Sequence, residues 1–186
     1  MSTEEILFDI EERMEKAINV LRDELRGVRT GRASPALVDT LRVEYYGSPT
    51  PLRQLAAIST PDAQQILIRP FDPGSIKEIE KAIQSSNIGL TPSSDGKIIR
   101  LTIPAMSGEQ RQKMVTHCKK LAEKAKVAIR NIRQDGNKSF DQAEKSKAMS
   151  EDDRDAGKEE VQKLTDKYVD QAQGVADKKA AEILEQ

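Results

Sequence analysis

The chain has 186 residues, of which 33% are charged and only 37% hydrophobic, so any apolar core must be thin or divided between domains. Thirty basic and 31 acidic residues give a formal net charge of −1, so whole-chain charge predicts neither a nucleic-acid-binding protein nor an acidic tail. One cysteine and one histidine exclude an intramolecular disulfide and a cysteine–histidine zinc site, which favours a reducing, cytoplasmic setting. No apolar run approaches the roughly 20 residues of a membrane span. The acidic start lacks the basic character of a signal or transit peptide, so we expect no membrane association.

The first segment predicts a long amphipathic helix from about residue 4 to residue 29. Its apolar residues recur at spacings of three or four, which winds one stripe along a helix. They are Leu7, Ile10, Met14, Ala17, Leu21, Leu25 and Val28.

The middle of the chain predicts a different kind of domain. All eight prolines fall between Pro35 and Pro104. Because proline in a helix interior costs about 3 kcal/mol, proline-free flanks around a proline-rich middle indicate helices interrupted by an insertion.

Within this insertion the hydrophobic period changes to two. Leu41, Val43 and Tyr45 alternate with their neighbours before a predicted turn at residues 47–49. Further strands are predicted at residues 56–60, 65–69 and 97–103. A short helix is expected to begin with a capping box formed by Ser75 and Glu78. These elements predict a small mixed α/β domain.

Two long helices follow the insertion. The first begins at Ser107, where Ser107 and Gln110 match a capping box, and runs for close to 40 residues with Gly136 as its expected weak point. Its stripe is Met114, Cys118, Leu121, Ala125, Ala128 and Ile132. The last helix starts near Ser150, followed by acidic residues that suit a helix N-terminus. Its stripe is Val161, Leu164, Tyr168, Ala172, Val175, Ala180 and Ile183.

The predicted fold class is α+β, an elongated three-helix bundle with an inserted small α/β domain. Three helices with narrow apolar stripes must bury those stripes together, so residues 1–30 and 106–186 form the bundle and residues 31–105 the insertion. Two connections join these domains, which predicts a two-stranded hinge. Its residues are Thr30, Gly31, Arg32, Ala33, Ser34, Pro104, Ala105 and Met106. We expect a monomer.

Charge is segregated among the three predicted helices. Residues 111–147 hold eleven basic and four acidic residues, whereas residues 150–186 hold six basic and eleven acidic ones. On a helix, four cations of the second helix fall within about 40° of one line, away from the apolar stripe. We call Lys119, Lys126, Arg130 and Arg133 the basic ridge.

A rigid row of lysines and arginines suits the phosphates of structured RNA. Arg26, Arg29 and Arg32 cluster after the first helix, and an antiparallel bundle could bring them toward Arg130 or Arg133. The alternative is that the charged helices pair with oppositely charged neighbours and bind nothing.

The other chemistry-bearing residues predict structural roles. Cys118 lies on an apolar stripe and is expected in the core, and His117 on the surface. Tyr45 and Tyr46 are expected to pack in a strand, although one ring could face a partner. No nucleophile elbow, phosphate-binding loop or dinucleotide motif occurs, which predicts a protein that is not an enzyme.

Residues 28–52, VRTGRASPALVDTLRVEYYGSPTPL, closely resemble the bacterial ribosome recycling factors. The resemblance continues through residues 53–56, 127–133, 150–153 and 161–166, and covers essentially the whole chain. It implies an L-shaped protein with an outline similar to transfer RNA. It also implies that Arg29, Arg130 and Arg133 bind the ribosomal RNA of the large subunit, with Lys119 and Lys126 expected to contribute.

The resemblance further implies that elongation factor G, with GTP, acts against the inserted domain and splits the ribosome into subunits. The GTPase belongs to that partner, so we expect no cofactor. One departure from the family pattern is Gln134, where a second basic residue after Arg133 is expected. The alternatives left open are a cytosolic helical scaffold that binds another protein and an RNA chaperone.

Overall fold

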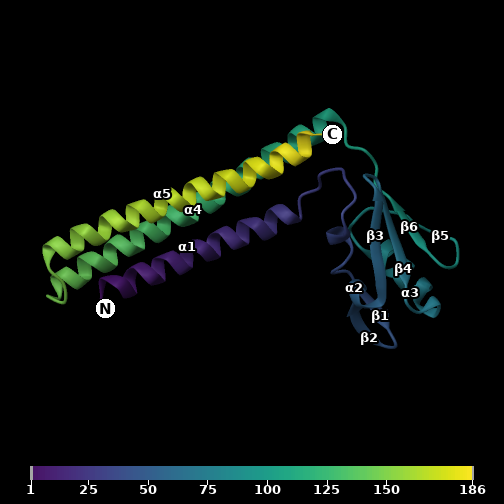
Figure 1. Ribbon diagram of the computed structural model, residues 1–186, viewed down its shortest axis with the longest axis horizontal. Coiled ribbons are helices and arrows are strands. Elements are labelled where there is room, and N and C mark those ends of the chain that lie inside the picture. The colour runs from purple at the N-terminus through teal and green to yellow at the C-terminus, as the bar shows by residue number, and fades with distance from the viewer. Residues whose placement is uncertain (1, 186) are drawn as a thin grey trace. The chain divides into compact units, whose positions relative to one another are not determined.

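The computed structural model describes residues 2–185, and the chain divides into two compact units. One unit combines Met1–Val28 with Glu109–Gln186, and the other is Arg29–Gly108. The boundaries therefore fall at residues 28/29 and 108/109, compared with the expected 30/31 and 105/106. Each unit has its own arrangement of elements (Figure 1).

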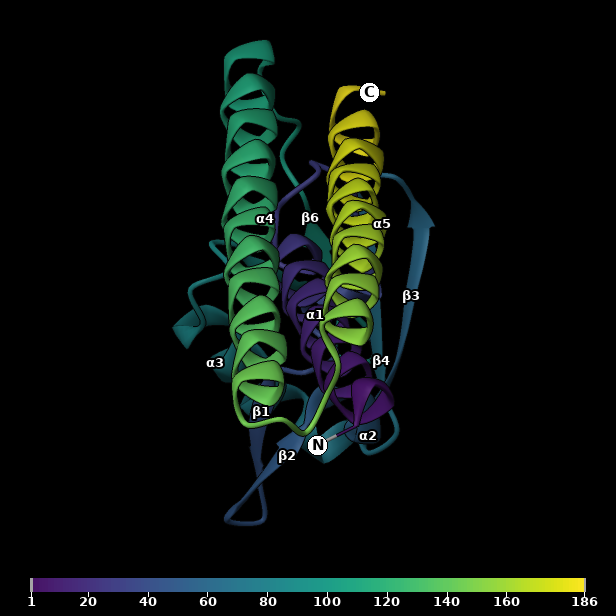
Figure 2. The same cartoon turned by 90° about the vertical axis from the view of Figure 1, so that its left-hand side faces the viewer.

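The first unit is a three-helix bundle of α1 (Thr3–Arg26), α4 (Gly108–Lys145) and α5 (Glu151–Leu184). Figures 1 and 2 show the three helices side by side. Two ion pairs fix the register of α1 against α4, since Arg13 meets Asp135 at 2.8 Å and Glu24 meets Lys124 at 2.7 Å. The two helices are thus antiparallel, as expected.

Side-chain caps define the starts of two of these helices. The Ser2 hydroxyl accepts a hydrogen bond from the Glu5 amide at 3.2 Å, and the Glu5 carboxylate accepts one from the Ser2 amide at 2.7 Å. At α5 the Ser150 hydroxyl accepts from the Asp153 amide at 3.1 Å, at the predicted position. These bonds satisfy amide groups that have no partner inside the helix.

The buried row of each bundle helix is displaced by one residue from part of the predicted stripe. Ile10, Met14 and Cys118 are fully buried as expected, whereas Leu7 and Met114 are only half-buried. Buried residues outside the predicted stripes are Ile6, Ile18, Val115, Ala122, Ile129, Phe140, Ala143, Thr165 and Ala176. On α4, for example, Val115, Ala122 and Ile129 are buried where Met114, Leu121 and Ala128 were predicted, so the helix buries one row of side chains that is rotated slightly from the predicted one.

Gly136 does not interrupt α4, and the expected weak point is wrong. The helix continues for 38 residues from Gly108 to Lys145, because at Gly136 it packs closely against α1. A Cβ atom at Gly136 would lie 2.4 Å from the Ile10 Cδ1 atom. The glycine is a packing residue that lets the two helices approach.

The second unit contains two antiparallel sheets. β1 (Arg42–Tyr45) pairs with β2 (Ser48–Pro51), and a four-stranded sheet has the order β3-β4-β6-β5. Its strands are β3 (Ala56–Asp62), β4 (Gln65–Pro70), β5 (Pro92–Ser94) and β6 (Ile99–Thr102). The helices are η1 (Pro35–Leu37), α2 (Leu52–Leu55), η2 (Pro73–Ser75) and α3 (Ile76–Ser85).

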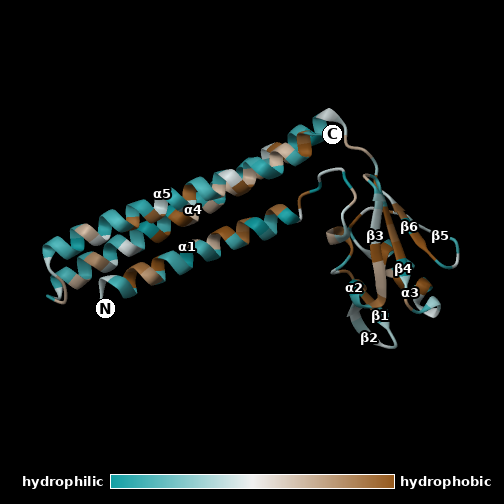
Figure 3. Cartoon of the chain, viewed as in Figure 1, coloured by the Kyte–Doolittle hydropathy of each residue, from teal (hydrophilic) through white to brown (hydrophobic). Residues whose placement is uncertain are grey.

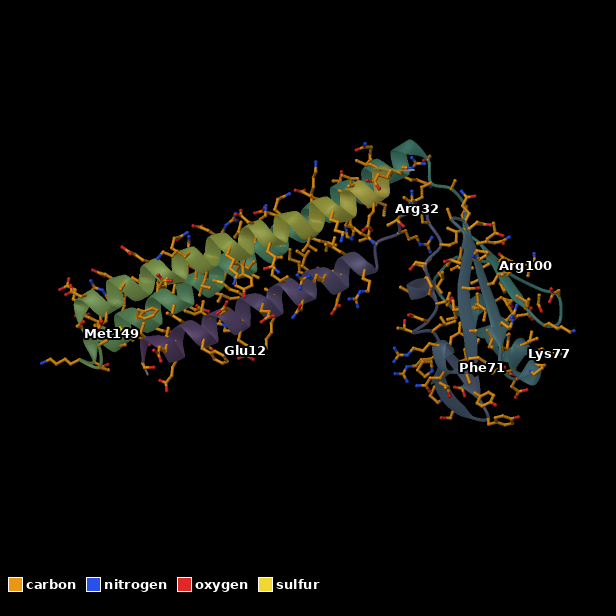
Figure 4. The ribbon with its side chains drawn as sticks, in the orientation of Figure 1. Glu12, Arg32, Phe71, Lys77, Arg100 and Met149 are labelled. Carbon is orange, nitrogen blue, oxygen red and sulfur yellow. The ribbon has the colours of Figure 1, made fainter. Side chains whose placement is uncertain are left out.

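The core of this unit joins alternate strand residues to α3. Ile66 and Ile68 of β4 are fully buried, as are Ile79 and Ile83 of α3. Figure 3 shows brown, hydrophobic stretches in the strands of this sheet and in α3, next to teal, hydrophilic segments. Lys77 and Arg100 are exposed and project outward (Figure 4).

Two local predictions for the insertion are wrong, and one strand was not predicted. The first hairpin turns at Tyr46 and Gly47, both with positive φ, as two-residue hairpin turns require, and Pro49 lies in β2 opposite Glu44. β5 lay in no predicted strand, because it is only three residues long. Ser75 does not cap α3 with its side chain, because its hydroxyl donates to the Asp72 carbonyl at 2.7 Å.

Tyr45 and Tyr46 have different surroundings at this turn. The Tyr45 hydroxyl donates to the Asp72 carboxylate at 3.3 Å, and its half-buried ring meets Tyr46 edge-on. The Tyr46 ring is 87% exposed, so the expectation that both pack in a strand is wrong for Tyr46. Its position in the turn, after the last residue of β1, leaves the ring without a core to enter.

Candidate nucleic-acid interface

All four residues of the basic ridge lie on α4, outside the buried core. Lys119 and Arg130 are exposed, and Lys126 and Arg133 are half-buried. Because α4 is one uninterrupted helix, about 57 Å long at 1.5 Å per residue, it holds these cations in a fixed row.

Two ridge cations are held by amide groups of α5. The Arg133 guanidinium donates to the Gln162 side-chain oxygen at 3.4 Å, and the Lys126 ammonium donates to the Gln173 side-chain oxygen. Both acceptors are neutral. The two cations are therefore oriented without a carboxylate that would cancel their charge.

The other two ridge residues are more open to solvent. Arg130 pairs with Glu123, two turns earlier on α4, at 3.0 Å, and both side chains are substantially exposed. Exposed pairs of this kind contribute little free energy, so a phosphate can compete for the Arg130 guanidinium. Lys119, the first residue of the ridge, is also exposed.

Charged residues of α4 that face α1 form direct ion pairs with it. Lys124 pairs with Glu24 at 2.7 Å, and Asp135 accepts from Arg13 at 2.8 Å. The hydrogen bond from Arg13 holds the pKa of Asp135 below its ordinary value. Pairing between oppositely charged helices, the alternative interpretation of the charge pattern, thus describes the α1 side of α4.

The arginines after α1 do not join the ridge as one group. The ion-pair register sets Arg26 beside residue 122 of α4, about 12 Å along the axis from Arg130, so its expected approach to Arg130 or Arg133 is wrong. Arg26 pairs with Asp23 at 3.4 Å. Arg29 and Arg32 belong to the second unit.

Arg29 has a structural contact of its own in the second unit. Its guanidinium donates to the backbone carbonyl of Ile88. The following residue, Gly89, has φ +71°, and a Cβ atom there would lie 3.6 Å from a nitrogen of the same guanidinium. Arg29 is nevertheless exposed, so its guanidinium is accessible to a phosphate from solvent.

The predicted hinge residues consist of irregular backbone at both connections. Gly31 has φ +77°, and the Thr30 hydroxyl accepts from the Arg32 amide at 3.4 Å. The Ala33 amide donates to the Ala63 carbonyl at 2.7 Å, and Ser34 caps η1, which anchors these two residues to the second unit. Pro104, Ala105 and Met106 lie outside helices and strands.

The remaining candidates for a site, in the part of the chain that the structure describes, are potential metal ligands and the single cysteine. Among residues 2–185, no three histidine, cysteine, aspartate or glutamate side chains gather to hold a metal ion. Cys118 is buried, and burial raises the pKa of its thiol. No helix within the same residues is long and apolar enough to cross a membrane.

Sequence reasoning missed Gln162 and Gln173 as part of this surface. Each glutamine is followed four residues later by an aspartate, Asp166 and Asp177, to which its amide group donates at 2.9 and 2.7 Å. The spacing Gln-x-x-x-Asp occurs twice, eleven residues apart, on one face of α5. That repeat marks the two glutamines as a matched pair in the sequence, but it does not reveal their contact with α4.

Comparison with known proteins gives consistent matches over nearly the whole chain. The family described as "Ribosome recycling factor" matches residues 21–184. The ribosome-recycling factor of Oleidesulfovibrio alaskensis is 51% identical over 97% of this chain and 98% of its own length. That of Bacillus subtilis is 48% identical over 98% of this chain and 99% of its own.

Two solved structures are similar to the whole chain at 38% sequence identity. A solution structure of the ribosome recycling factor aligns with a TM-score of 0.83, over 100% of this chain and 99% of that one. The second, with a TM-score of 0.67, covers 99% of this chain and 100% of that one. It is the Thermus thermophilus ribosome recycling factor, shown together with Escherichia coli elongation factor G bound to the Escherichia coli post-termination complex.

Proposed function

Because this chain belongs to the ribosome recycling factor family, we propose that it binds the ribosome after termination and, with elongation factor G and GTP, splits it into subunits. Messenger RNA and transfer RNA are then released for a new round of translation. The observation that carries this proposal is a full-length match to a recycling factor placed with elongation factor G on a post-termination complex.

The bundle supplies the RNA-binding surface in this proposal. The basic ridge of α4 contacts phosphates of large-subunit ribosomal RNA, with Arg130 and Arg133 at its centre and Lys119 and Lys126 beside them. Support comes from the fixed spacing of the row and from the neutral acceptors at Lys126 and Arg133, which leave their charge available. Arg29 adds a contact from the chain that leaves the bundle.

The inserted domain is the part on which elongation factor G acts. We place the pivot at residues 30–32 and 104–106, where the backbone is irregular and where Ala33 marks the start of firm attachment to the second unit. An uninterrupted α4 then transmits force along the bundle. Rotation about two short connections needs no unfolding of either unit.

The protein does no covalent chemistry in this mechanism and is not an enzyme. GTP hydrolysis takes place on elongation factor G, so this chain uses no cofactor of its own. It acts as a monomer in the cytoplasm, where its ribosomal partner is found.

Light scattering of post-termination ribosomes tests the proposal. Mixing them with this protein, elongation factor G from a matched bacterium and GTP should lower the scattering as subunits separate. Arg133→Ala should slow or abolish the drop. Lys124→Ala is the matched control, because it removes the same charge from the same helix on the side facing α1.

The outcomes separate this function from its alternatives. A drop that needs all three components and is lost in Arg133→Ala supports recycling through the ridge. No drop with folded protein would favour a helical scaffold. Activity on naked RNA without elongation factor G would favour an RNA chaperone.

A further inference from the structure

Two cations of the ridge share the same arrangement of side-chain partners on α5. Arg133 and Lys126 each donate to a glutamine oxygen of α5, and the amide group of each glutamine donates to an aspartate one turn further on. The first group is Arg133, Gln162 and Asp166, and the second is Lys126, Gln173 and Asp177. We call each group a relay.

The aspartate decides which way the glutamine points. A carboxylate accepts hydrogen bonds only, so it must face the glutamine amide group, which in turn directs the glutamine oxygen to the cation. Asp166 accepts from Gln162 at 2.9 Å, and Asp177 accepts from Gln173 at 2.7 Å. The aspartate therefore determines that the glutamine nitrogen faces the carboxylate and the glutamine oxygen faces the cation.

The same geometry separates the cation from the carboxylate. Where a cation of α4 meets a carboxylate directly, as Lys124 meets Glu24, the two charges are 2.7 Å apart and largely offset each other. In a relay a whole amide group stands between them. The cation is oriented while its field toward solvent is retained.

We infer that Gln162 and Asp166, and likewise Gln173 and Asp177, are positioning residues that hold Arg133 and Lys126 ready for RNA phosphates. The inference rests on the proposed function and deepens it. It assigns part of the RNA-binding machinery to α5, a helix whose net charge is negative and which would otherwise repel RNA.

The decisive experiment asks whether Asp166→Ala strengthens or weakens binding to large ribosomal subunits. Asp166→Ala removes a negative charge near the ridge, so simple electrostatics predicts tighter binding to large ribosomal subunits. Loss of positioning predicts weaker binding, by about two- to fivefold. This is the lower part of the range of interaction energies found between neighbouring residues in double-mutant cycles. Asp170→Ala is the matched control, because Asp170 is an exposed carboxylate one turn further along α5 and outside both relays.

A double-mutant cycle shows whether the effect passes through Arg133. In an Arg133→Ala background, Asp166→Ala should no longer weaken binding, since the group it positions is gone. In the wild-type background, Asp166→Ala should also lower the steepness of the plot of log affinity against log salt concentration by up to about one. If Asp166 only stabilised the fold, its effect on binding would not depend on Arg133, and the salt dependence of binding would not change.

Gln162→Leu provides a second route, because it removes the middle of the relay without changing charge. Weaker binding in both variants, with thermal unfolding unchanged, supports the relay. Tighter binding of Asp166→Ala, as for Asp170→Ala, overturns it. If Arg133→Ala itself left binding unchanged, the proposed ridge would fail, which is a separate and recognisable result.

Discussion

The two seams of the bundle use the same helix in different ways. Along the α1–α4 seam, charged groups meet directly, as in Lys124 with Glu24 and Asp135 with Arg13. Along the α4–α5 seam, Arg133 meets a glutamine, and the direct ion pairs there, Asp141 with Lys158 and Glu144 with Arg154, join carboxylates of α4 to cations of α5. What a cation of α4 can do is therefore decided by the partner helix, and net charge alone does not reveal it.

The seams also differ in how a glycine is used. At Gly136, in the α1–α4 seam, the nearest atom is the Cδ1 end of the Ile10 side chain. At Gly157, in the α4–α5 seam, it is the ring of Phe140, which is fully buried. A flexible chain end can move aside, whereas a packed aromatic ring cannot, so the seams should tolerate substitution unequally.

The largest effect is expected at Gly157. In Gly157→Ala the new Cβ atom would lie 2.3 Å from Phe140 Cε1, so the ring or the helix must shift. Overpacking should exceed the gain in helix propensity and lower the free energy of unfolding by about 2 kcal/mol. Urea unfolding followed by circular dichroism measures it. A Phe140→Leu background should reduce the loss, and an equal loss there would contradict the proposed clash.

A smaller difference is expected between cations of the two seams in RNA binding. Arg133→Ala should weaken the affinity for large ribosomal subunits about tenfold, or about 1.4 kcal/mol, whereas Lys124→Ala should change it little. Filter binding over a range of salt concentrations provides both affinities and slopes. Equal losses for the two variants would show that only total charge matters.

Acid should weaken both seams, with smaller effects. Hydrogen bonds from Arg13 and Lys158 lower the pKa values of Asp135 and Asp141. A lowered folded-state pKa contributes stability above the ordinary carboxyl pKa of about 4, which is lost as the pH falls through the folded value. Asp135→Asn and Asp141→Asn should therefore be less stable than wild type at pH 7, and their deficit should shrink by pH 3. Thermal unfolding at both values tests this, and a pH-independent deficit would argue against it.

The smallest effect is expected at Gly136. Gly136→Ala requires that the end of the Ile10 side chain shift, because its Cδ1 and Cγ1 atoms would lie 2.4 and 3.0 Å from the new Cβ atom. Alanine favours a helix by about 1 kcal/mol over glycine. The two contributions should nearly cancel, leaving stability within about 0.5 kcal/mol of wild type. The same urea titration used for Gly157→Ala makes this a direct comparison. A loss as large as that at Gly157 would mean that the two glycines act alike.

The long helices were predictable because each repeats one signal many times. Val161, Tyr168 and Ile183 are buried on α5 as the periodicity indicated, and Ser150 begins that helix. Short elements carry too few residues for a pattern. β5 has three, and Pro49 indicated a turn although it pairs in a strand of a two-stranded sheet, where a missing amide is tolerated.

The ridge could be found from the sequence, but its surroundings could not. Helical spacing aligned Lys126 and Arg133 without structure. Their contact with Gln173 and Gln162 depends on the register between α4 and α5, which arises from packing between residues far apart in the chain. Gly136 was misread for the same reason, since its neighbour Ile10 lies 126 positions away in the sequence.

The outer strands of the four-stranded sheet bear on self-association. β3 and β5 form its edges, where unpaired backbone groups could recruit a strand from another copy. Each contains a proline, Pro61 in β3 and Pro92 in β5, and β3 is irregular between Ser59 and Asp62. Proline has no amide hydrogen to offer, so both borders of the sheet discourage amyloid-like growth.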